Sequence, residues 1–287
     1  MYSCSVVVTT YRRPELLRTC LDSIFRQDAE VDVIVIDDDP LRTAEPVVAG
    51  CEGGEIRYLC TEGQSGPCTA RNLGVRMARC AEIVHLDDDT VLPTQGILHA
   101  ALDDLGTDGI AAVAMPYQNV NLSQEVLSHS PNVDGVALTY AFTACAYAIK
   151  QQPFVAVGGY REFFFYMGEE SDLCIRLAAE NLGTRLGTGP SVHHLQPAGR
   201  ISAAADFYGR RNEVLFEVLN APASLVVPAL MRVSTKAVVY GIRCRRLGIM
   251  LHGLMAGYRE GAKRRNLRQP VPLNVYQRFR RLVKDRT

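Results

Sequence analysis

The sequence of 287 residues lacks several features that would place it in a common class of protein. No apolar run approaches the roughly 20 residues that a membrane-spanning helix needs. The N-terminus has no basic segment followed by a long apolar core, so we expect no signal peptide. The nine cysteines include no CxxC pair and no metal-finger spacing, which favours reduced thiols in a cytoplasmic protein. Internal repeats and low-complexity tracts are also absent.

Charge is distributed unevenly along a chain whose net charge is zero. Residues 221–287 carry 15 Lys and Arg against two acidic residues, a balance of +13, which leaves −13 for the first 220 residues. Apolar residues are interleaved with these basic ones, a pattern typical of amphipathic helices. Such helices either lie on an anionic membrane surface or pack on the preceding domain with a solvated basic face. Nucleic acid is a weaker third candidate, because the region has few aromatics and no recognised nucleic-acid module.

Two runs of three aspartates, Asp37–Asp39 and Asp87–Asp89, stand out in the N-terminal part of the chain. Each follows a short apolar stretch that is typical of a buried strand. Residues 5–10 predict a further strand, and the apolar spacing over 14–25 predicts a helix between it and the first aspartate run. Strand, helix and strand in this order form a βαβ unit, whose strands are parallel.

Both aspartate runs therefore fall at the carboxyl ends of parallel strands, where α/β sheets bind their ligands. Three adjacent carboxylates repel one another, and a hard divalent cation such as Mg²⁺ or Mn²⁺ relieves that repulsion. The alternative for a single run is an acidic turn or a helix cap. The presence of two runs at equivalent positions favours a ligand site.

A glycine-rich loop precedes a second predicted helix. Residues 56–60 predict a third strand, residues 61–67 form the loop, and residues 68–78 predict the helix, which carries Arg71 and Asn72 in its first turn. A loop of this kind before a helix can hold a phosphate group. It lacks the GK[ST] ending of a P-loop and the GxGxxG spacing of a dinucleotide site, so alone it is a weak indication.

The order of these motifs resembles that of the family-2 glycosyltransferases, which are inverting enzymes of the GT-A fold. The motifs are TTYRR, DDD, ARN and DDD, followed by FVAVGGYREFFFYMGEESDLCIRLAAENLG (154–183) and GPSVHHLQ (189–196). The resemblance covers about residues 3–220. It implies an α/β fold with a Rossmann-like, mostly parallel sheet flanked by helices over 1–220. The basic region over 221–287, which its own charge and apolar pattern predict to be helical, lies outside the resemblance.

The resemblance also implies roles for individual residues. Thr9 and Tyr11 would lie against the base and ribose of a nucleotide, although from the residues alone strand-end packing is the better explanation. Asp38 would accept a hydrogen bond from the base, and Arg71 would reach the diphosphate or hold the neighbouring loop. Asp87 would contact the ribose or a metal-bound water. The full set of expected nucleotide-binding residues is Thr9, Tyr11, Arg13, Asp38, Arg71, Asp87 and Asp88, with Asp89 as a direct ligand of Mn²⁺ or Mg²⁺.

The motif GEESDL indicates the catalytic base. The family usually has Glu-Asp at its first two positions and uses the second as the proton acceptor, which here is Glu170, one methylene longer. Acidic residues in a first helical turn also stabilise the helix dipole, which is the alternative role for Glu169 and Asp172. We predict Glu170 as the general base. Glu169 and Asp172 are secondary candidates, and Asp172 is better suited to holding the helix start or a neighbouring arginine.

Two adjacent histidines, His193 and His194, follow in a short predicted strand or loop. In the family a late histidine often completes the metal site, although a histidine after a strand is more often structural. Because Val192 should point into the core, the alternation of a strand turns His193 away and His194 back. We therefore expect His194 as the ligand and keep His193 as the other candidate. An imidazole ligand favours Mn²⁺ over Mg²⁺.

Asp37 and Asp39 flank the aspartate that is expected at the base site. One of them can cap the turn that follows the strand. The family often has a glycine at the position of Asp39, and we expect its carboxylate to be solvated. Residues 97–150 vary most within the family and carry no predicted role.

These expectations define one function and two alternatives. The chain should transfer a sugar, with UDP- or dTDP-sugars favoured, to a hydroxyl of a glycan or lipid-linked acceptor in polysaccharide assembly. It would act in the cytoplasm or at the inner face of the membrane. A sugar-1-phosphate nucleotidyltransferase would instead carry a glycine-rich GxGxR-type loop after the first strand, where this chain has TTYRRPE. A non-catalytic, membrane-associated scaffold of the same fold should bind neither nucleotide nor metal.

Overall fold

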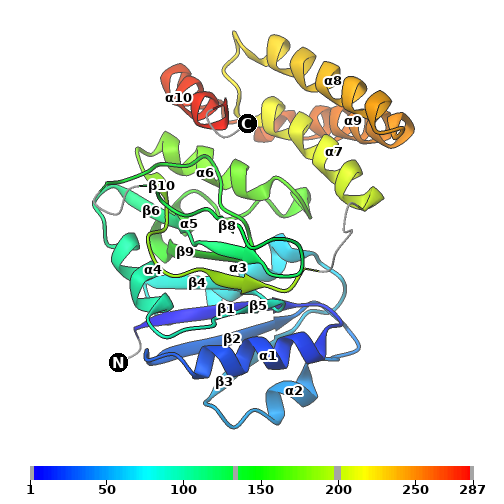
Figure 1. The fold of residues 1–287 in the computed structure, drawn as a ribbon. Helices are drawn as coiled ribbons and strands as arrows, with labels where there is room; N and C mark the ends of the chain where they lie inside the picture. Colours follow the sequence, from blue (N-terminus) through cyan, green and yellow to red (C-terminus); the bar gives the residue numbers. More distant parts are fainter. Residues whose placement is uncertain (1–2, 132–134, 197–201, 285–287) are drawn as a thin grey trace.

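The computed structural model describes residues 3–131, 135–196 and 202–284. Within these ranges, seven strands form a sheet in the order β10-β6-β9-β4-β1-β2-β3, and four form a smaller sheet in the order β5-β11-β7-β8. Helices flank the larger sheet, and a layer of C-terminal helices covers one side of the domain (Figure 1). The strands are β1 (Cys4–Thr10), β2 (Val31–Asp37), β3 (Ile56–Cys60), β4 (Glu82–Asp87), β5 (Thr90–Val91), β6 (Ile110–Ala114), β7 (Tyr117–Asn119), β8 (Val126–Leu127), β9 (Ala146–Lys150), β10 (Gly183–Leu186) and β11 (Val192–His194).

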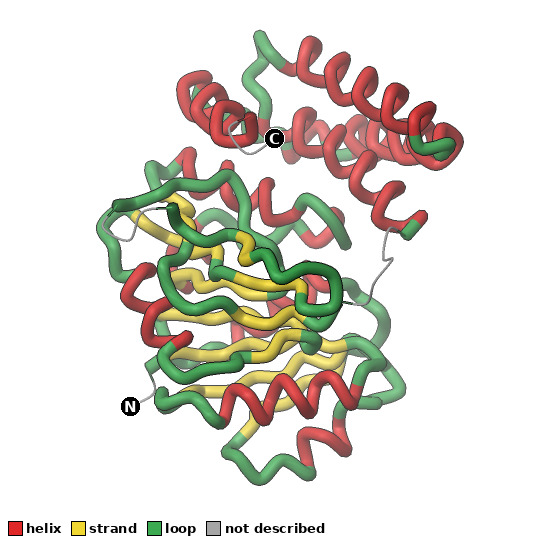
Figure 2. The backbone as a smooth tube through the Cα atoms, in the orientation of Figure 1, coloured by secondary structure: helices red, strands yellow, loops and turns green. Residues whose placement is uncertain are grey.

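The helices alternate with strands over β1 to β4 and follow one another from α7 to α10. Figure 2 shows the strands gathered in the body of the domain and a group of helices beyond it. They are α1 (Pro14–Phe25), α2 (Glu45–Ala49), α3 (Pro67–Met77), α4 (Ile97–Leu105), α5 (Gln151–Ala156), α6 (Glu169–Ala179), α7 (Ala203–Asn220), α8 (Val226–Arg243), α9 (Leu247–Lys263) and α10 (Leu273–Lys284), with short 3₁₀ turns at Glu162–Phe164 and Arg265–Leu267.

The central strands are parallel, as their continuous apolar runs indicate. β1 pairs in parallel with both β2 and β4, whereas β9 enters antiparallel between β4 and β6. Every residue of β1 is buried, which is the pattern of a strand covered on both faces. The expectation of an α/β fold with a mostly parallel sheet flanked by helices is therefore confirmed.

Close packing of α3 on β1 depends on a glycine. A Cβ added at Gly74 would lie 2.2 Å from a methyl carbon of Val7. On the other face of the sheet, α1 buries Leu17, Leu21 and Ile24. Two extensive apolar clusters, one on each face, thus hold the strands that end at the aspartate runs.

The C-terminal helices form a separate layer that rests on α6 through α7 and α10 (Figure 1). Gly253, Gly257 and Gly261 of α9 face α7, and a Cβ at Gly257 would lie 2.6 Å from a carbonyl oxygen of that helix. Tyr276 and Phe279 of α10 are buried in the main core. Because α7 contacts both α6 and the helices that follow it, the predicted domain division after residue 220 stays a prediction. Among the described residues, no helix is both long enough and apolar enough to cross a membrane.

Candidate active site

The carboxyl ends of β1, β2 and β4 form the edge of the sheet where most of the predicted site residues gather. Parallel pairing places Thr9 of β1 beside Asp87 of β4. Asp38 directly follows β2, and Asp88 and Asp89 directly follow β4. Both aspartate runs therefore lie at one edge, on either side of β1. Tyr11 lies at the end of β1, where the guanidinium of Arg12 stands over its ring at 5.0 Å from the centroid.

Arg13 holds the two aspartates that follow β4. Its guanidinium lies 2.5 Å from Asp88 Oδ1 and 2.7 Å from Asp89 Oδ2. Thr10 Oγ1 also donates a hydrogen bond to Asp88 Oδ2 at 2.7 Å. Burial raises the pKa of Asp88 to about 7, and the opposing effect of Arg13 is smaller. Burial acts in the same direction on Asp89, but His194 and Arg13 outweigh it and lower the pKa of that carboxyl to about 2.

His194 faces Asp89 from the smaller sheet. Its Nε2 lies 3.4 Å from Asp89 Oδ1, and its Nδ1 lies 2.7 Å from Asn119 Oδ1. Because an amide oxygen only accepts, Nδ1 donates to Asn119, and this contact fixes the orientation of the ring with Nε2 facing the Asp89 carboxylate. His193 is partly exposed between the buried residues Val192 and His194. Of the two histidines, it is His194 that meets the aspartate run.

The pair of Asp89 and His194 has the chemistry of a divalent-cation site. His194 Nε2 and Asp89 Oδ1 lie 3.4 Å apart, and a ring nitrogen and a carboxylate oxygen in this arrangement can share a proton or, with the ring neutral, hold a cation between them. A carboxylate and an imidazole together suit Mn²⁺, and Asn119 orients the ring as an outer partner of a metal ligand does. Within the described ranges, no three Asp, Glu, His or Cys side chains group closely enough to hold a metal ion by themselves. The other ligands would therefore be phosphate oxygens and water, as is usual for cations bound with nucleotides.

Arg71 joins the end of β4 to the helix that carries the predicted base. Its buried guanidinium donates to Asp87 Oδ1 at 2.9 Å and to Glu169 Oε1 at 3.1 Å. Gly168, with a φ of +83°, turns the chain into α6, so that Glu169 is the first residue of the helix. The bridge therefore fixes the start of α6 against the aspartate run, although the two segments are far apart in sequence.

Glu170 follows this bridge and remains partly exposed. Desolvation raises the pKa of Glu170 above its ordinary value, and repulsion from Glu169 adds to the rise. A carboxylate whose pKa is raised is, once ionised, a stronger base than an ordinary one. Glu169, in contrast, is almost fully buried and engaged by Arg71. Of the two glutamates, Glu170 is the more accessible to an acceptor.

Asp172 is part of a buried network that ties α6 to its neighbours. Its Oδ1 accepts hydrogen bonds from Arg161 and from Asn220, each at 2.8 Å, and its Oδ2 accepts one from Arg176 at 3.0 Å. Arg176 in turn donates to two carbonyl oxygens of the segment before α6. These contacts connect α6 to α7 and favour a structural role for Asp172 over a catalytic one.

The variant Asp172→Asn is expected to lower the free energy of unfolding by about 3 kcal/mol, because the buried Arg176 and the partly buried Arg161 would lose their carboxylate partner. The transfer rate per folded molecule should fall far less than the stability. Urea denaturation measures the first effect, and Asp103→Asn, which changes an exposed aspartate of α4, is the control. A variant as stable as the wild type but inactive would instead make Asp172 a catalytic residue.

Asp38 is engaged by the loop that follows β3. Its carboxylate accepts hydrogen bonds from Thr61 Oγ1, from the backbone N–H and hydroxyl of Ser65, and from the N–H of Gly66. The aspartate expected at the base site thus also shapes the glycine-rich loop before α3. Oδ2 accepts from Gly66 alone among these donors, which leaves it capacity for one further hydrogen bond.

The other two aspartates of the first run are structural. Asp37 accepts from the N–H of Ala44 and from the hydroxyl of Tyr58, and so fixes the turn after β2. The expectation that Asp39 is solvated is wrong. Its side chain is completely buried and accepts from Arg12 Nε at 3.2 Å and Thr43 Oγ1 at 3.0 Å. The chain after Asp39 folds back over it, which no local sequence signal indicates.

Two residues of this edge were not predicted. Asn119 orients His194, and Thr10 donates to Asp88. Asn119 ends a three-residue strand in a region to which the sequence assigned no role, and it meets His194 only through the pairing of β7 with β11. Thr10 directly follows the predicted site residue Thr9 in the TTYRR motif, so its position in the motif could have indicated a place in the site.

The family model of glycosyl transferase family 2 matches residues 5–167. The succinoglycan biosynthesis protein ExoO of Rhizobium meliloti (strain 1021) is 33% identical over 89 residues. That alignment covers 30% of this chain and 26% of the relative, so this chain matches about a quarter of the relative's length.

Several solved structures share the fold at low sequence identity. The mannosyltransferase PcManGT from Pyrobaculum calidifontis, in complex with GDP-Man and Mn²⁺, has a TM-score of 0.61 at 18% identity, over 88% of this chain and 74% of its own. GalNAc-T7 with UDP, GalNAc and Mn²⁺ has a TM-score of 0.63 at 13% identity, over 76% of this chain and 48% of its own. Residues 1–349 of TarS from S. aureus have a TM-score of 0.55 at 15% identity, over 90% and 91% of the two chains.

These findings agree with the arrangement of the sheet and of the aspartate runs at its edge. The family model spans more than half of the chain, and the structural neighbours are glycosyltransferases of the GT-A fold. The chain therefore belongs to glycosyl transferase family 2 and has the GT-A fold of that family.

Proposed function

We propose that this family 2 glycosyltransferase moves a sugar from a nucleoside diphosphate to a hydroxyl acceptor, with inversion and with Mn²⁺ or Mg²⁺ bound. UDP- and dTDP-sugars are the favoured donors. The observation that supports the proposal most is the bridge from Asp87 through Arg71 to Glu169. It keeps the start of α6, and with it Glu170, next to the residues that would hold the donor diphosphate.

In the proposed reaction, the acceptor oxygen attacks the anomeric carbon from the face opposite the nucleotide. The bond from that carbon to the diphosphate oxygen breaks while the new bond forms, and its electron pair leaves with the nucleoside diphosphate. Glu170 takes the proton of the attacking hydroxyl. Such a direct displacement inverts the anomeric centre and needs no carboxylate nucleophile, unlike the reaction of retaining glycosidases.

The residues around Asp89 would prepare the diphosphate site. Asp89 and His194 would hold the divalent cation, which when bound supplies positive charge to the departing diphosphate. Arg13 keeps the carboxylates of Asp88 and Asp89 in place, and Asn119 fixes the ring of His194. Because these side chains are already held in place, they need to move little when the donor binds.

Nucleotide recognition would use the ends of β1 and β2. Thr9 and Tyr11 would border the base and ribose, and Asp38 Oδ2 would accept a hydrogen bond from a base N–H. Uracil and thymine each offer such an N–H, which is the reason to favour UDP and dTDP. Because PcManGT was solved with GDP-Man and two other neighbours with UDP, guanine nucleotides belong in any comparison.

Thermal-shift measurements with UDP-, dTDP- and GDP-sugars in the presence of Mn²⁺ test the donor class. A donor present at a hundred times its dissociation constant should raise the melting temperature by about 5 °C or more. The stabilising donor is then used for transfer to model acceptors, and the anomeric configuration of the product is determined by NMR. We expect the configuration opposite to that of the donor; retention would contradict the proposed displacement.

Two other functions are less well supported. A sugar-1-phosphate nucleotidyltransferase is not favoured, because the chain matches the model of glycosyl transferase family 2 and has TTYRRPE after β1. A non-catalytic scaffold would give no thermal shift with any donor and Mn²⁺. Asp87 and Asp89 lie at the sheet edge and Glu170 lies in the first turn of α6, which supports catalysis.

The acceptor is proposed as a growing glycan or a lipid-linked glycan. The name of the relative ExoO connects that protein with succinoglycan biosynthesis. A lipid-linked acceptor would bring the enzyme to the inner face of a membrane as a peripheral protein. The +13 balance of residues 221–287 supports attraction to an anionic surface there.

A further inference from the structure

Helix α8 is packed on one side only. Ala229, Val233 and Ala237 are buried, and the last two pack in a small cluster with α7 and α9. On the opposite side, three large apolar side chains are 63%, 66% and 62% exposed: Val227, Met231 and Ile242. These residues are separated by 4 and by 11 positions, close to whole turns of an α-helix, so they form a single stripe.

Helix α9 carries a matching stripe. Leu251, Met255 and Tyr258 are 41%, 62% and 41% exposed, and they follow one another at spacings of four and three. They lie opposite the glycines by which α9 packs on α7. On the exposed side, a hydrogen bond of 2.8 Å joins Tyr258 OH to Ser234 Oγ of α8. The two stripes therefore lie side by side and form one surface, here called the outer face of α8–α9.

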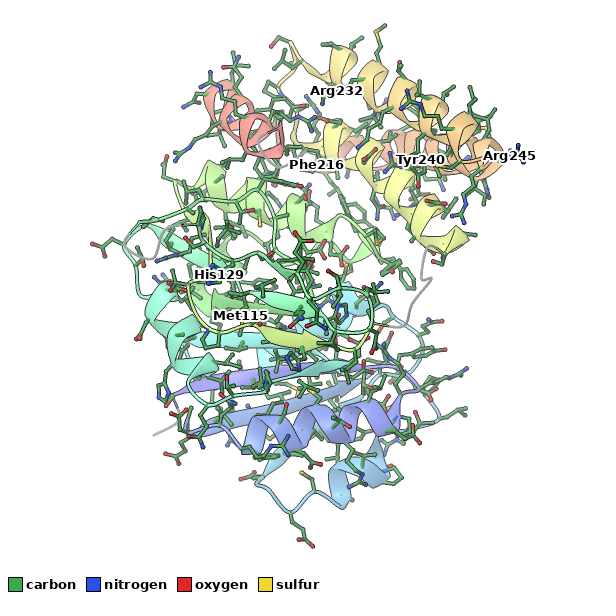
Figure 3. All side chains as sticks on the ribbon, viewed as in Figure 1. Met115, His129, Phe216, Arg232, Tyr240 and Arg245 are labelled. Carbon is green, nitrogen blue, oxygen red and sulfur yellow. The ribbon has the colours of Figure 1, made fainter. Side chains whose placement is uncertain are left out.

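Exposed arginines lie on the same two helices as this outer face and in the turn between them. Arg243 and Arg259 are exposed on α8 and α9, and Arg245 is exposed in the turn between the helices, at the outer end of the helical layer (Figure 3). Glu260 is the only acidic residue in the sequence from 226 to 263, and it pairs with Lys263 and with an arginine just beyond α9. The charge of the three arginines is therefore not cancelled from within the hairpin.

Helix α10 differs from α8 and α9, although it contributes to the same basic region. Tyr276 and Phe279 are buried, and Tyr276 OH donates to Glu217 of α7 at 2.5 Å. The apolar side of α10 thus packs into the main core, and Arg278 and Arg281 are exposed on its other side. An amphipathic sequence has resulted in intramolecular packing at α10 and in an exposed apolar surface at α8–α9.

We propose that the outer face of α8–α9 binds the surface of an anionic lipid bilayer. Apolar side chains flanked by cations match such a surface, because the side chains enter the boundary of the acyl chains while the arginines contact the headgroups. A second copy of the chain fits less well, since a two-fold contact through this face would bring the same arginines together. The proposal identifies the part of the basic region that meets the membrane and does not depend on which sugar is transferred.

Co-sedimentation of the full chain with vesicles tests the proposal. The vesicles consist of phosphatidylcholine with or without phosphatidylglycerol, at low and at high salt. The double variant Met231→Ser/Met255→Ser removes apolar contact, and its partitioning should be weaker by about tenfold or more. The double variant Arg243→Gln/Arg259→Gln should weaken binding to the anionic vesicles by about fivefold per arginine, with the difference disappearing at high salt.

Matched controls change equivalent side chains on the catalytic domain. Val155→Ser alters an apolar residue of α5 that is 59% exposed, and Arg76→Gln alters an exposed arginine of α3. Neither should change vesicle binding, and none of the variants should change the melting temperature much, because all the altered side chains are exposed. The proposal is overturned if the full chain does not bind anionic vesicles at low salt, or if the controls weaken binding as much as the outer-face variants. It is also overturned if the Met231/Met255 variant only dissolves a dimer, seen by light scattering, and still binds vesicles normally.

Discussion

Replacing Glu170 with glutamine is expected to slow sugar transfer by about 10²–10⁴, the range typical of lost acid–base catalysis. Glutamine keeps the shape of the side chain but cannot accept the proton of the attacking hydroxyl. The affinity for the donor should barely change, because Glu170 would face the acceptor while the diphosphate is held at Asp89 and His194. Turnover, donor affinity by calorimetry and melting temperature, measured together, separate a lost base from a disturbed site.

The pH dependence of turnover gives a second readout for the same residue. Desolvation and the neighbouring Glu169 raise the pKa of Glu170 above its ordinary value of 4.5. Because only the ionised carboxylate accepts a proton, the rate should fall as the pH drops through this raised pKa and should level off above it. The acid limb should therefore lie well above pH 4.5 in the wild type and disappear in Glu170→Gln.

The control for this substitution lies on the same helix. Glu180→Gln changes an exposed glutamate at the end of α6 and should leave both turnover and its pH profile unaltered. If Glu170→Gln retains near-normal turnover while Glu169→Gln abolishes it without unfolding, the base is Glu169. In that case the bridge to Arg71 would have to open during the reaction, since it engages Glu169 Oε1 in this structure.

The parts of the site that follow from local pattern were predictable from the sequence. The apolar runs before each aspartate cluster form β2 and β4, and both are parallel to β1, so the rule that parallel strands end at one edge places the clusters correctly. The alternation along β11 also gives the orientation in which His194, and not His193, is buried. Each of these inferences needs only two facts: side chains alternate between the two faces of a strand, and neighbouring strands in a βαβ unit run parallel.

The contacts that depend on distant segments were not predictable. Asn119 meets His194 through two short strands that are far apart in sequence, and neither has a periodic signal. Asp39 is covered because Arg12, with a φ of +56°, and the turn after β2 close over it. The basic helices show the same limit, since amphipathic periodicity is equally compatible with packing on the domain and with an exposed apolar face. Only the tertiary contacts distinguish α10 from α8 and α9.

Replacing Asp89 with alanine is expected to make nucleotide binding independent of the divalent cation. In the wild type, UDP or dTDP should bind about 10–100-fold more tightly with Mn²⁺ than with EDTA. The variant Asp89→Ala should bind the nucleotide in both conditions only as weakly as the wild type does with EDTA. The reason is that Asp89 would supply the charged oxygen ligand of the cation. Calorimetric titration of the nucleotide with Mn²⁺ and then with EDTA measures the effect directly.

A second variant and a control make this result specific to the proposed cation site. Asn119→Ala leaves both proposed ligands in place but removes the hydrogen bond that orients the His194 ring, so the affinity for Mn²⁺ should fall by about 10–100-fold. Asp28→Ala is the control, because it removes a carboxylate that lies 3.2 Å from the imidazole of His99 on the exposed surface. Equal nucleotide affinities of the wild type with Mn²⁺ and with EDTA would show that Asp89 and His194 are not a cation site for the nucleotide. The pairing of Asp89 with Arg13 and His194 would then be a structural contact, and its removal should appear as a lower melting temperature.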